Sequence, residues 1–362
     1  MTETMKAVVL TGHGGLDRLV YREDWPKPQA GPGEVLIKVA ACGLNNTDVN
    51  TRTGWYSKAV RQATLGDGYE TINTDDPSWG GSSITFPRIQ GADVVGTVEA
   101  VGDGADPALI GRRVMIDTWL RDWDDPLNLE KTGYYGSECN GGFAEYTTAD
   151  VRNVHPIESA LSDAELATFA TASITAENML RRAEVGEGDT VLVPGASGGV
   201  GSALIQLAHR RGARTVALCG ADKADQVAML KPYAVLPRAP EDLAAALKDA
   251  IGQETVTVVA DVVGGTLWPQ LIEVLARGGR YTCAGAIAGP IVEFDLRSFY
   301  LKDLVFTGAT IVPPGLFAKL VGYIERGEIC PLLAETHPLA DLHKAQEAFI
   351  AKRHVGNIVV TP

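Results

Sequence analysis

The first 155 residues alternate apolar and polar positions in short runs, a pattern typical of β-strands. Residues 94–101 follow the strand period, in which every second side chain faces the same side of a sheet. Residues 5–10, 34–40 and 111–116 are further strand candidates, and turns rich in proline and glycine separate them. We therefore expect the first part of the chain to be β-rich.

From about residue 156 the pattern changes, and apolar runs of strand length alternate with segments of helical spacing. The expected strands are residues 191–193, 215–219, 233–236, 255–261, 280–284, 303–311 and 357–360. The expected helices are residues 161–180, 221–230, 240–251, 267–276, 315–325 and 339–352. Such alternation implies an α/β fold with a doubly wound parallel sheet that is covered by helices on both faces.

Residues 190–202 contain a glycine-rich turn between a predicted strand and a predicted helix. Gly195 would permit the tight turn out of the strand, Gly198 would leave room for a pyrophosphate, and Gly201 would let the helix pack close to the sheet. The free N–H groups and the positive end of such a helix attract a phosphate. A purely structural turn is the alternative, but the next predicted strand follows at the spacing of a βαβ unit, which favours dinucleotide binding.

Two long polar segments interrupt the predicted strands. Residues 57–87 form an unusually long connection, and loops of this length are either functional or disordered. Tyr69 and Trp79 within it favour a lid beside a binding site. The second segment, residues 119–138, reads as another polar loop with three aromatic residues, Trp123, Tyr134 and Tyr135.

Length and charge limit the possible functions. A chain of 362 residues has room for two domains, and its formal net charge of −13 argues against nucleic acid or an anionic membrane as a partner. No signal-peptide pattern or membrane-spanning apolar run is visible. The five cysteines lack paired spacing, so we interpret them as reduced thiols of a cytoplasmic protein. A small-molecule substrate is the partner that remains.

Several blocks in the same order give the chain its resemblance to a known family. They are residues 32–39, 43–48, 91–102, 141–146, the glycine turn, and 355–360. Together they resemble the medium-chain dehydrogenase/reductase superfamily. The resemblance implies a GroES-like catalytic domain over residues 1–155, completed by residues 313–362, and a Rossmann domain that binds NADP(H) over residues 156–312.

Two departures from that family concern zinc. The zinc alcohol dehydrogenases of the superfamily have a cysteine where this chain has Asn45, and a histidine where it has Ala92. Catalytic zinc needs three protein ligands and an open fourth position, and an alanine cannot ligate a metal. We therefore expect a zinc-independent enzyme that stabilises an oxyanion with hydrogen-bond donors. This chemistry resembles that of the zinc-less quinone and enoyl-thioester reductases. A simple alcohol or aldehyde dehydrogenase and a cofactor-binding scaffold with little turnover are the alternatives.

The resemblance to enoyl-thioester reductases also suggests catalytic residues. Tyr56 matches a tyrosine that acts there as proton donor or oxyanion partner, and Asn45 and Asp48 match polar positions that line the active site. Two of them have a structural alternative: Tyr56 could pack at a domain hinge, and Asp48 could cap a helix.

The choice of nicotinamide depends on the end of the second Rossmann strand, where enzymes that prefer NAD carry an acidic residue. Here that position is Cys219, followed by Gly220. Lys223 and Arg238 match cations that hold the 2′-phosphate in the resembling enzymes, so we expect NADP(H). The alternative is that both are solvated surface charges. Further cofactor contacts implied by the resemblance are Ser197, Gly198, Gly199 and Val200 at the pyrophosphate, Thr175 beside the nicotinamide, and Val263 and Gly285 along the groove.

The predicted strand at residues 303–311 is apolar enough to pair across a subunit interface, as it does in related enzymes. A homodimer is therefore expected.

Overall fold

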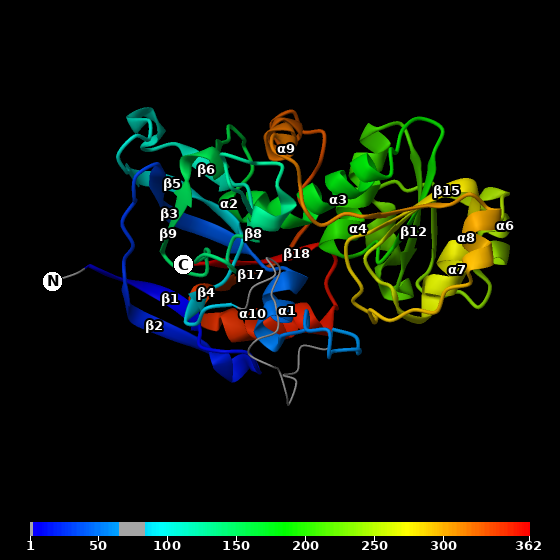
Figure 1. Cartoon of the computed structure of the whole chain (residues 1–362), viewed down its shortest axis with the longest axis horizontal. Helices are drawn as coiled ribbons and strands as arrows, with labels where there is room; N and C mark the ends of the chain where they lie inside the picture. The colour runs from blue at the N-terminus through cyan, green and yellow to red at the C-terminus, as the bar shows by residue number, and fades with distance from the viewer. Residues whose placement is uncertain (1–2, 65–83) are drawn as a thin grey trace. The chain divides into compact units, whose positions relative to one another are not determined.

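The structure is a computed structural model that describes residues 3–64 and 84–362. The chain forms two compact units (Figure 1). Unit 1 comprises Met1–Val60, Leu65–Thr171 and Pro313–Pro362, and unit 2 comprises Arg61–Thr64 and Ala172–Val312. The predicted lid residues Tyr69 and Trp79 lie outside the described residues. No helix of the described residues is long and apolar enough to cross a membrane.

Unit 1 is built mainly from antiparallel strands. One sheet has the order β2-β1-β4, a second has the order β10-β6-β5-β3-β18-β17 with β9 also paired to β3, and β7 pairs with β8. The strands are β1 Thr4–Leu10, β2 Leu19–Pro26, β3 Glu34–Gly43, β4 Arg88–Ile89, β5 Asp93–Val101, β6 Arg113–Ile116, β7 Trp119–Leu120, β8 Gly133–Tyr134, β9 Tyr146–Asp150, β10 Val154–Pro156, β17 Leu333–Pro338 and β18 Asn357–Thr361. The helices are α1 Asn46–Thr53, α2 Asp163–Leu166, α9 Leu316–Glu325 and α10 Leu342–Ala351. This is the predicted GroES-like β-rich architecture.

Strand β3 organises the larger sheet of unit 1, because it pairs with β5, β9 and β18. Its side chains Ile37 and Ala41 are completely buried, and so are Val94 and Val95 of the neighbouring β5. The ends of β3 and β5 meet where Gly43 lies opposite Asp93. This register places the last residue of β3 opposite the first residue of β5.

Unit 2 contains a parallel sheet of six strands in the order β13-β12-β11-β14-β15-β16. The strands are β11 Thr190–Pro194, β12 Arg214–Cys219, β13 Ala234–Pro237, β14 Val256–Asp261, β15 Leu275–Cys283 and β16 Val305–Gly308. The helices are α3 Ala170–Arg182, whose first residues belong to unit 1, α4 Gly199–Arg210, α5 Ala224–Ala228, α6 Leu243–Ile251, α7 Trp268–Glu273 and α8 Leu296–Leu301. Helices lie on both faces of this sheet (Figure 1). The strand order is that of dinucleotide-binding sheets, which bind their ligand at the carboxyl ends of the central strands.

Two predicted elements are wrong. The helix expected over residues 161–180 is divided into α2 and α3. Ser162 and Glu165 form a capping box that starts α2, and the Ala167 carbonyl then lies so close to Gly43 that a Cβ there would be 2.3 Å from it. The polar loop expected over residues 119–138 contains the β7–β8 pair, and Tyr134 and Tyr135 are buried.

Candidate active site

Helix α1 and the residue before it position two of the predicted catalytic residues, Asn45 and Asp48. Asn45 is the N-cap of the helix and has an extended backbone. Its backbone N–H donates to Oδ2 of Asp48 at 2.8 Å, so the carboxyl caps the start of the helix. Asp48 is 4% exposed, and the side chain of Gln90 donates to its backbone carbonyl at 3.0 Å. Asp48 therefore caps a helix, which is the structural alternative that the sequence analysis gave for it.

Burial also changes the acidity of Asp48. Loss of solvation raises the pKa of its carboxyl to about 7, and the nearby charge of Asp93 adds to the rise. The backbone N–H groups of Asn45 and Gly91 oppose it, because they stabilise the carboxylate. Asp48 therefore titrates near neutral pH, unlike an exposed aspartate.

Asp93, the first residue of β5, was not predicted as a site residue. It is completely buried, and its Oδ1 accepts hydrogen bonds from the backbone N–H of Thr171 at 2.9 Å and from the Thr171 hydroxyl. Burial raises the pKa of Asp93 to about 6, while Thr171 and the side chain of Asn45 lower it. Asp93 thus connects the N-cap of α1 to the start of α3.

Tyr134 is hydrogen-bonded to Thr171 and so joins the same set of buried polar side chains. Its hydroxyl lies 2.5 Å from the Thr171 hydroxyl, and its ring packs edge-on against Trp119 with centroids 5.5 Å apart. Burial raises the pKa of Tyr134 well above its usual value, and the charges of Asp93, Asp48 and Tyr56 act in the same direction. Tyr56 lies close enough to add this effect, although it is itself only half-buried.

We call Asn45, Asp48, Asp93, Tyr134 and Thr171 the buried carboxyl cluster. The sequence prediction included Asn45 and Asp48 but missed the other three. One signal for Asp93 was available, because a charged residue at the start of an apolar strand is expensive to bury without a partner. Tyr134 and Thr171 gave no comparable signal.

The position of a zinc-ligating histidine in related enzymes is occupied by Ala92, which is completely buried and offers no ligand atom. Cys42 is also buried near the cluster, and burial together with the charges of Asp48 and Asp93 raises the pKa of its thiol well above the usual value. In the part of the chain that the structure describes, no three histidine, cysteine or acidic side chains come together in a group that could hold a metal ion.

The glycine turn of unit 2 has the geometry that the sequence predicts. Gly195 has a φ of +67°, a left-handed conformation that favours glycine. A Cβ on Gly201 would lie 2.3 Å from the carbonyl oxygen of Gly195, so the helix meets the turn at a distance that only glycine allows. A Cβ on Gly198, the N-cap of α4, would meet no protein atom closer than 3.5 Å. The space beside Gly198 is therefore open to a ligand, and the first N–H groups of α4 have no partner within the helix.

The turn adjoins the ends of the neighbouring strands. A Cβ on Gly195 would lie 3.0 Å from Val263, which follows β14, and one on Gly285 would lie 3.1 Å from the carbonyl oxygen of Val262. Val263 is fixed because its N–H donates to Asp261 at 2.7 Å. Ser197, Gly199 and Val200 belong to the turn and the first residues of α4, whereas Thr175 is half-buried on α3. The predicted groove residues after β11, β14 and β15 are thus brought together.

The residues predicted to select the cofactor also lie together, at the end of β12. Cys219 is the last residue of the strand, and Gly220 leads into a 3-10 turn that ends at Lys223. Burial and the charge of Arg238 lower the pKa of Lys223, whereas the charge of Asp222 raises it. The two predicted phosphate partners are therefore close enough to repel each other. Asp222 is an acidic neighbour that the sequence prediction did not include.

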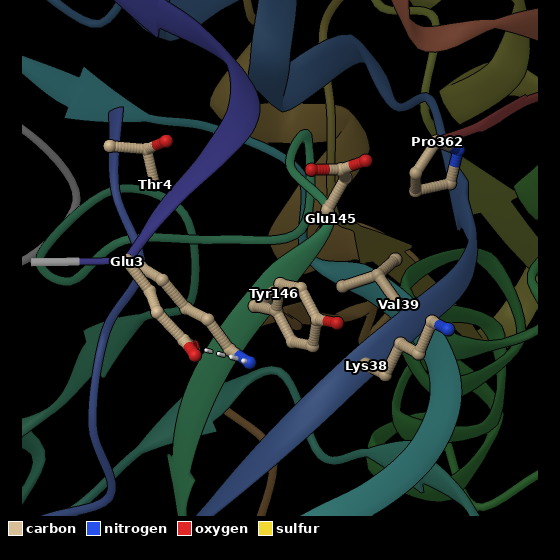
Figure 2. Close-up of a pocket in the computed structure, with 8 residues that line it drawn as sticks. Glu3, Thr4, Lys38, Val39, Glu145, Tyr146 and Pro362 are labelled. Atoms are coloured by element: carbon tan, nitrogen blue, oxygen red, sulfur yellow. Dashed lines mark ion pairs between the residues drawn. The ribbon is translucent and has the colours of Figure 1, made fainter. Parts of the chain in front are cut away.

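A separate pocket of about 460 Å³ in unit 1 contains none of the predicted site residues (Figure 2). Lys27, which lines it, pairs with Glu3 at 3.3 Å and with Glu99 at 2.8 Å, and its ammonium lies 4.0 Å from the centre of the Tyr146 ring. The ammonium of Lys27 is thus paired within the protein, so we assign the group a structural role.

A sheet with the strand order of dinucleotide-binding domains in one unit and a buried polar cluster in a GroES-like unit are features of an oxidoreductase. Residues 31–159 match the family "Alcohol dehydrogenase GroES-like domain", and residues 199–326 match "Zinc-binding dehydrogenase". The chain belongs to the medium-chain dehydrogenase/reductase superfamily, as the sequence blocks indicated.

Within this superfamily the chain is similar to proteins of several activities. It is 27% identical over 369 residues to the acryloyl-coenzyme A reductase of Metallosphaera sedula, covering 99% of this chain and 100% of the relative. It is 25% identical over 354 residues to the human quinone oxidoreductase, covering 96% and 94%. A solved structure of an alcohol dehydrogenase-like protein from Sinorhizobium meliloti 1021 is 46% identical, with a TM-score of 0.91, and covers 100% of this chain and 98% of that one.

Proposed function

We propose that the protein is a zinc-independent, NADPH-dependent reductase of an activated alkene or a quinone. The observation that carries this proposal is the replacement of zinc ligands by the buried Ala92 and by Asn45, beside a cluster rich in hydrogen-bond donors. Ala92 cannot donate an electron pair to a metal. The similarity to quinone oxidoreductases and acryloyl-coenzyme A reductases supports the same class of reaction.

In the proposed reaction, bound NADPH supplies a hydride. The chain must then stabilise negative charge on the substrate oxygen and supply a proton. Tyr56 donates a hydrogen bond to that oxygen, and Tyr56 or solvent provides the proton. Asn45 orients the substrate, and Asp48 keeps Asn45 in place through the helix cap.

NADP(H) is proposed as the cofactor because the last residue of β12 is Cys219 and not an acidic residue, and because Lys223 and Arg238 lie near each other there, with Asp222 as the acidic neighbour of Lys223. A dianionic phosphate would relieve the repulsion between the two cations. Ser197, Gly198, Gly199, Val200 and Gly201 would hold the pyrophosphate with backbone N–H groups.

The proposed assembly is a cytoplasmic homodimer. Strand β16 is an edge of the parallel sheet, and its Val305 is 51% exposed. An edge strand with an apolar surface is a surface on which a second strand can pair.

The proposal is tested by following NADPH oxidation with quinones, enones, enoyl thioesters and aldehydes, using protein whose metal content has been measured. Turnover of enones, enoyl thioesters or quinones by protein without zinc is the expected result. Turnover with aldehydes alone would favour the alcohol dehydrogenase alternative, to which the similarity to the Sinorhizobium protein points. Binding of NADPH without turnover of any acceptor would favour a cofactor-binding scaffold.

A further inference from the structure

Three side chains of unit 1 form one continuous hydrogen-bonded line. Thr171 has a single hydroxyl proton, and it donates this proton to Asp93. The hydroxyl of Tyr134, 2.5 Å from Thr171, must then donate to Thr171 as long as Asp93 is a carboxylate. The line therefore runs from Tyr134 through Thr171 to Asp93.

Protonation of Asp93 would reverse this line. A protonated Asp93 donates to the Thr171 oxygen, Thr171 donates to the Tyr134 oxygen, and the Tyr134 proton is released to point at another acceptor. Only the hydroxyl protons move, so no heavy atom has to shift. The second oxygen of Asp93, Oδ2, is buried and has no partner at hydrogen-bonding geometry within the part of the chain described, although the Asn45 side chain lies near enough to lower the pKa of Asp93.

We propose that Asp93 stores the proton for the reduction and passes it through Thr171 to Tyr134, which delivers it to the substrate. This inference rests on the proposed function and refines the source of the proton. Tyr134 is the catalytic residue of the line, and Thr171 and Asp93 are positioning residues. Tyr56 then keeps the role of hydrogen-bond donor to the substrate oxygen.

The step balances in protons and electrons. After hydride addition the substrate is an enolate, and its electron pair takes the proton of the Tyr134 hydroxyl. The Tyr134 oxygen receives the Thr171 proton, and the Thr171 oxygen receives the Asp93 proton. Asp93 becomes a carboxylate and, after the product leaves, regains a proton along the same line, from water at Tyr134. Both electrons come from the hydride, and the products are the saturated carbonyl compound and oxidised cofactor.

The surroundings of Asp93 suit a group that exchanges a proton near neutral pH. The groups that face it are the amide of Asn45, the carboxyl of Asp48, the thiol of Cys42 and the hydroxyls of Thr171 and Tyr134. Across residues 3–64 and 84–362, no lysine, arginine or histidine forms an ion pair with Asp93. Burial accordingly raises its pKa to about 6, a value at which both protonation states are populated in the cell.

The competing explanation is that the line only holds β5 and α3 together. The same chain offers a matched structural pair: the buried Tyr135 hydroxyl lies 2.6 Å from Thr147 and 2.5 Å from the carbonyl oxygen of Thr148. This pair resembles Tyr134 and Thr171, but among the described residues the Tyr135 hydroxyl hydrogen-bonds only to Thr147 and to the Thr148 carbonyl, not to a carboxyl. Tyr135→Phe is therefore the control for the loss of a buried tyrosine hydroxyl.

The test compares Asp93→Asn, Thr171→Val, Thr171→Ser, Tyr134→Phe and Tyr135→Phe in steady-state NADPH oxidation with the best acceptor of the wild-type protein. Asp93→Asn, Thr171→Val and Tyr134→Phe should each lower kcat by about 100-fold or more, with little change in the Michaelis constant, because general acid–base catalysis typically contributes roughly 10²–10⁴-fold. Each should also change the solvent deuterium isotope effect on kcat. Thr171→Ser should recover most of the activity, and Tyr135→Phe should keep it.

Two readouts do not depend on turnover. NADPH binding, followed by its fluorescence, should be unchanged in all variants. In cofactor-free protein, ¹³C NMR of labelled aspartate should show a higher Asp93 pKa in Thr171→Val than in wild type, because the lost hydroxyl stabilised the carboxylate.

The outcomes separate the two proposals. A wild-type protein that turns over no acceptor contradicts the proposed function. An active wild type whose kcat and isotope effect are the same in Thr171→Val and Asp93→Asn contradicts the proton line alone. Equal losses in Tyr134→Phe and Tyr135→Phe, with falling thermal stability in both, would assign the line a structural role.

Discussion

The Asp48 carboxyl should make the protein less stable as the pH rises, and Asp48→Asn should remove this effect. Its folded-state pKa of about 7 lies above the ordinary value of 3.8. An acid whose pKa is raised by folding stabilises the folded state fully below the unfolded pKa, and this contribution is lost as pH rises through the folded pKa. Asparagine keeps an oxygen that can accept the Asn45 N–H but carries no charge.

The size of the effect follows from the difference in pKa. A shift of roughly three units corresponds to about 4 kcal/mol at 1.36 kcal/mol per unit. Between pH 5 and pH 8, on the order of 2–3 kcal/mol of this should be lost, because part of the range lies below pH 5. Asp48 and Asp93 interact, so the pair titrates together and this figure is an order of magnitude.

The assay is urea unfolding of wild type, Asp48→Asn and the exposed control Asp103→Asn at pH 5 and pH 8. The stability of Asp48→Asn relative to wild type should rise by about 2–3 kcal/mol between the two pH values. Asp103→Asn should show no such rise. If Asp48→Asn is instead more destabilised at pH 8 than at pH 5, Asp48 is needed as a charged cap and the reasoning is refuted.

The remaining predictions concern unit 2. Replacing Lys223 and Arg238 with alanine should raise the Michaelis constant for NADPH at least about tenfold, because charged hydrogen bonds to the 2′-phosphate are lost. The Michaelis constant for NADH should stay nearly unchanged. Equal changes for both cofactors would contradict the binding of the 2′-phosphate by Lys223 and Arg238. Gly201→Ala should abolish NADPH binding or destabilise the protein, since its Cβ would lie 2.3 Å from a carbonyl oxygen, whereas Gly186→Ala meets no atom within 4 Å and should be tolerated. Val305→Lys should yield a monomer in analytical ultracentrifugation if β16 forms the subunit interface, and an unchanged dimer would place the interface elsewhere.

The sequence predicted the fold well where the structure of a segment depends only on the residues of that segment. The glycine turn is the best example. Its left-handed Gly195 and the close contact at Gly201 both require glycine, and both glycines lie within one short segment. The strands of the parallel sheet were predicted for the same reason, whereas β2, β9, β10 and β17 of unit 1 were not predicted. The helix predicted over residues 161–180 was wrong because a turn divides it, and at this turn the Ala167 carbonyl packs against Gly43, more than 100 residues earlier in the chain.

The candidate site was predicted only in part. Asn45 and Asp48 lie within one short block and could be compared with related enzymes. Asp93, Tyr134 and Thr171 come from β5, β8 and the start of α3, and only folding brings their side chains together. Asp222 was missed because the sequence prediction considered the strand end and the cations but not the acidic residue between them.

The most direct test of a metal-free reductase is to locate the transferred hydrogen. Chelator-treated, zinc-free protein is incubated with NADPH that carries deuterium at C4 and with an enone, and the product is analysed by NMR. We expect a saturated ketone with deuterium at the β carbon, formed at the same rate as before chelation. An allylic alcohol labelled at the carbonyl carbon, or activity that returns only when zinc is added, would contradict the account.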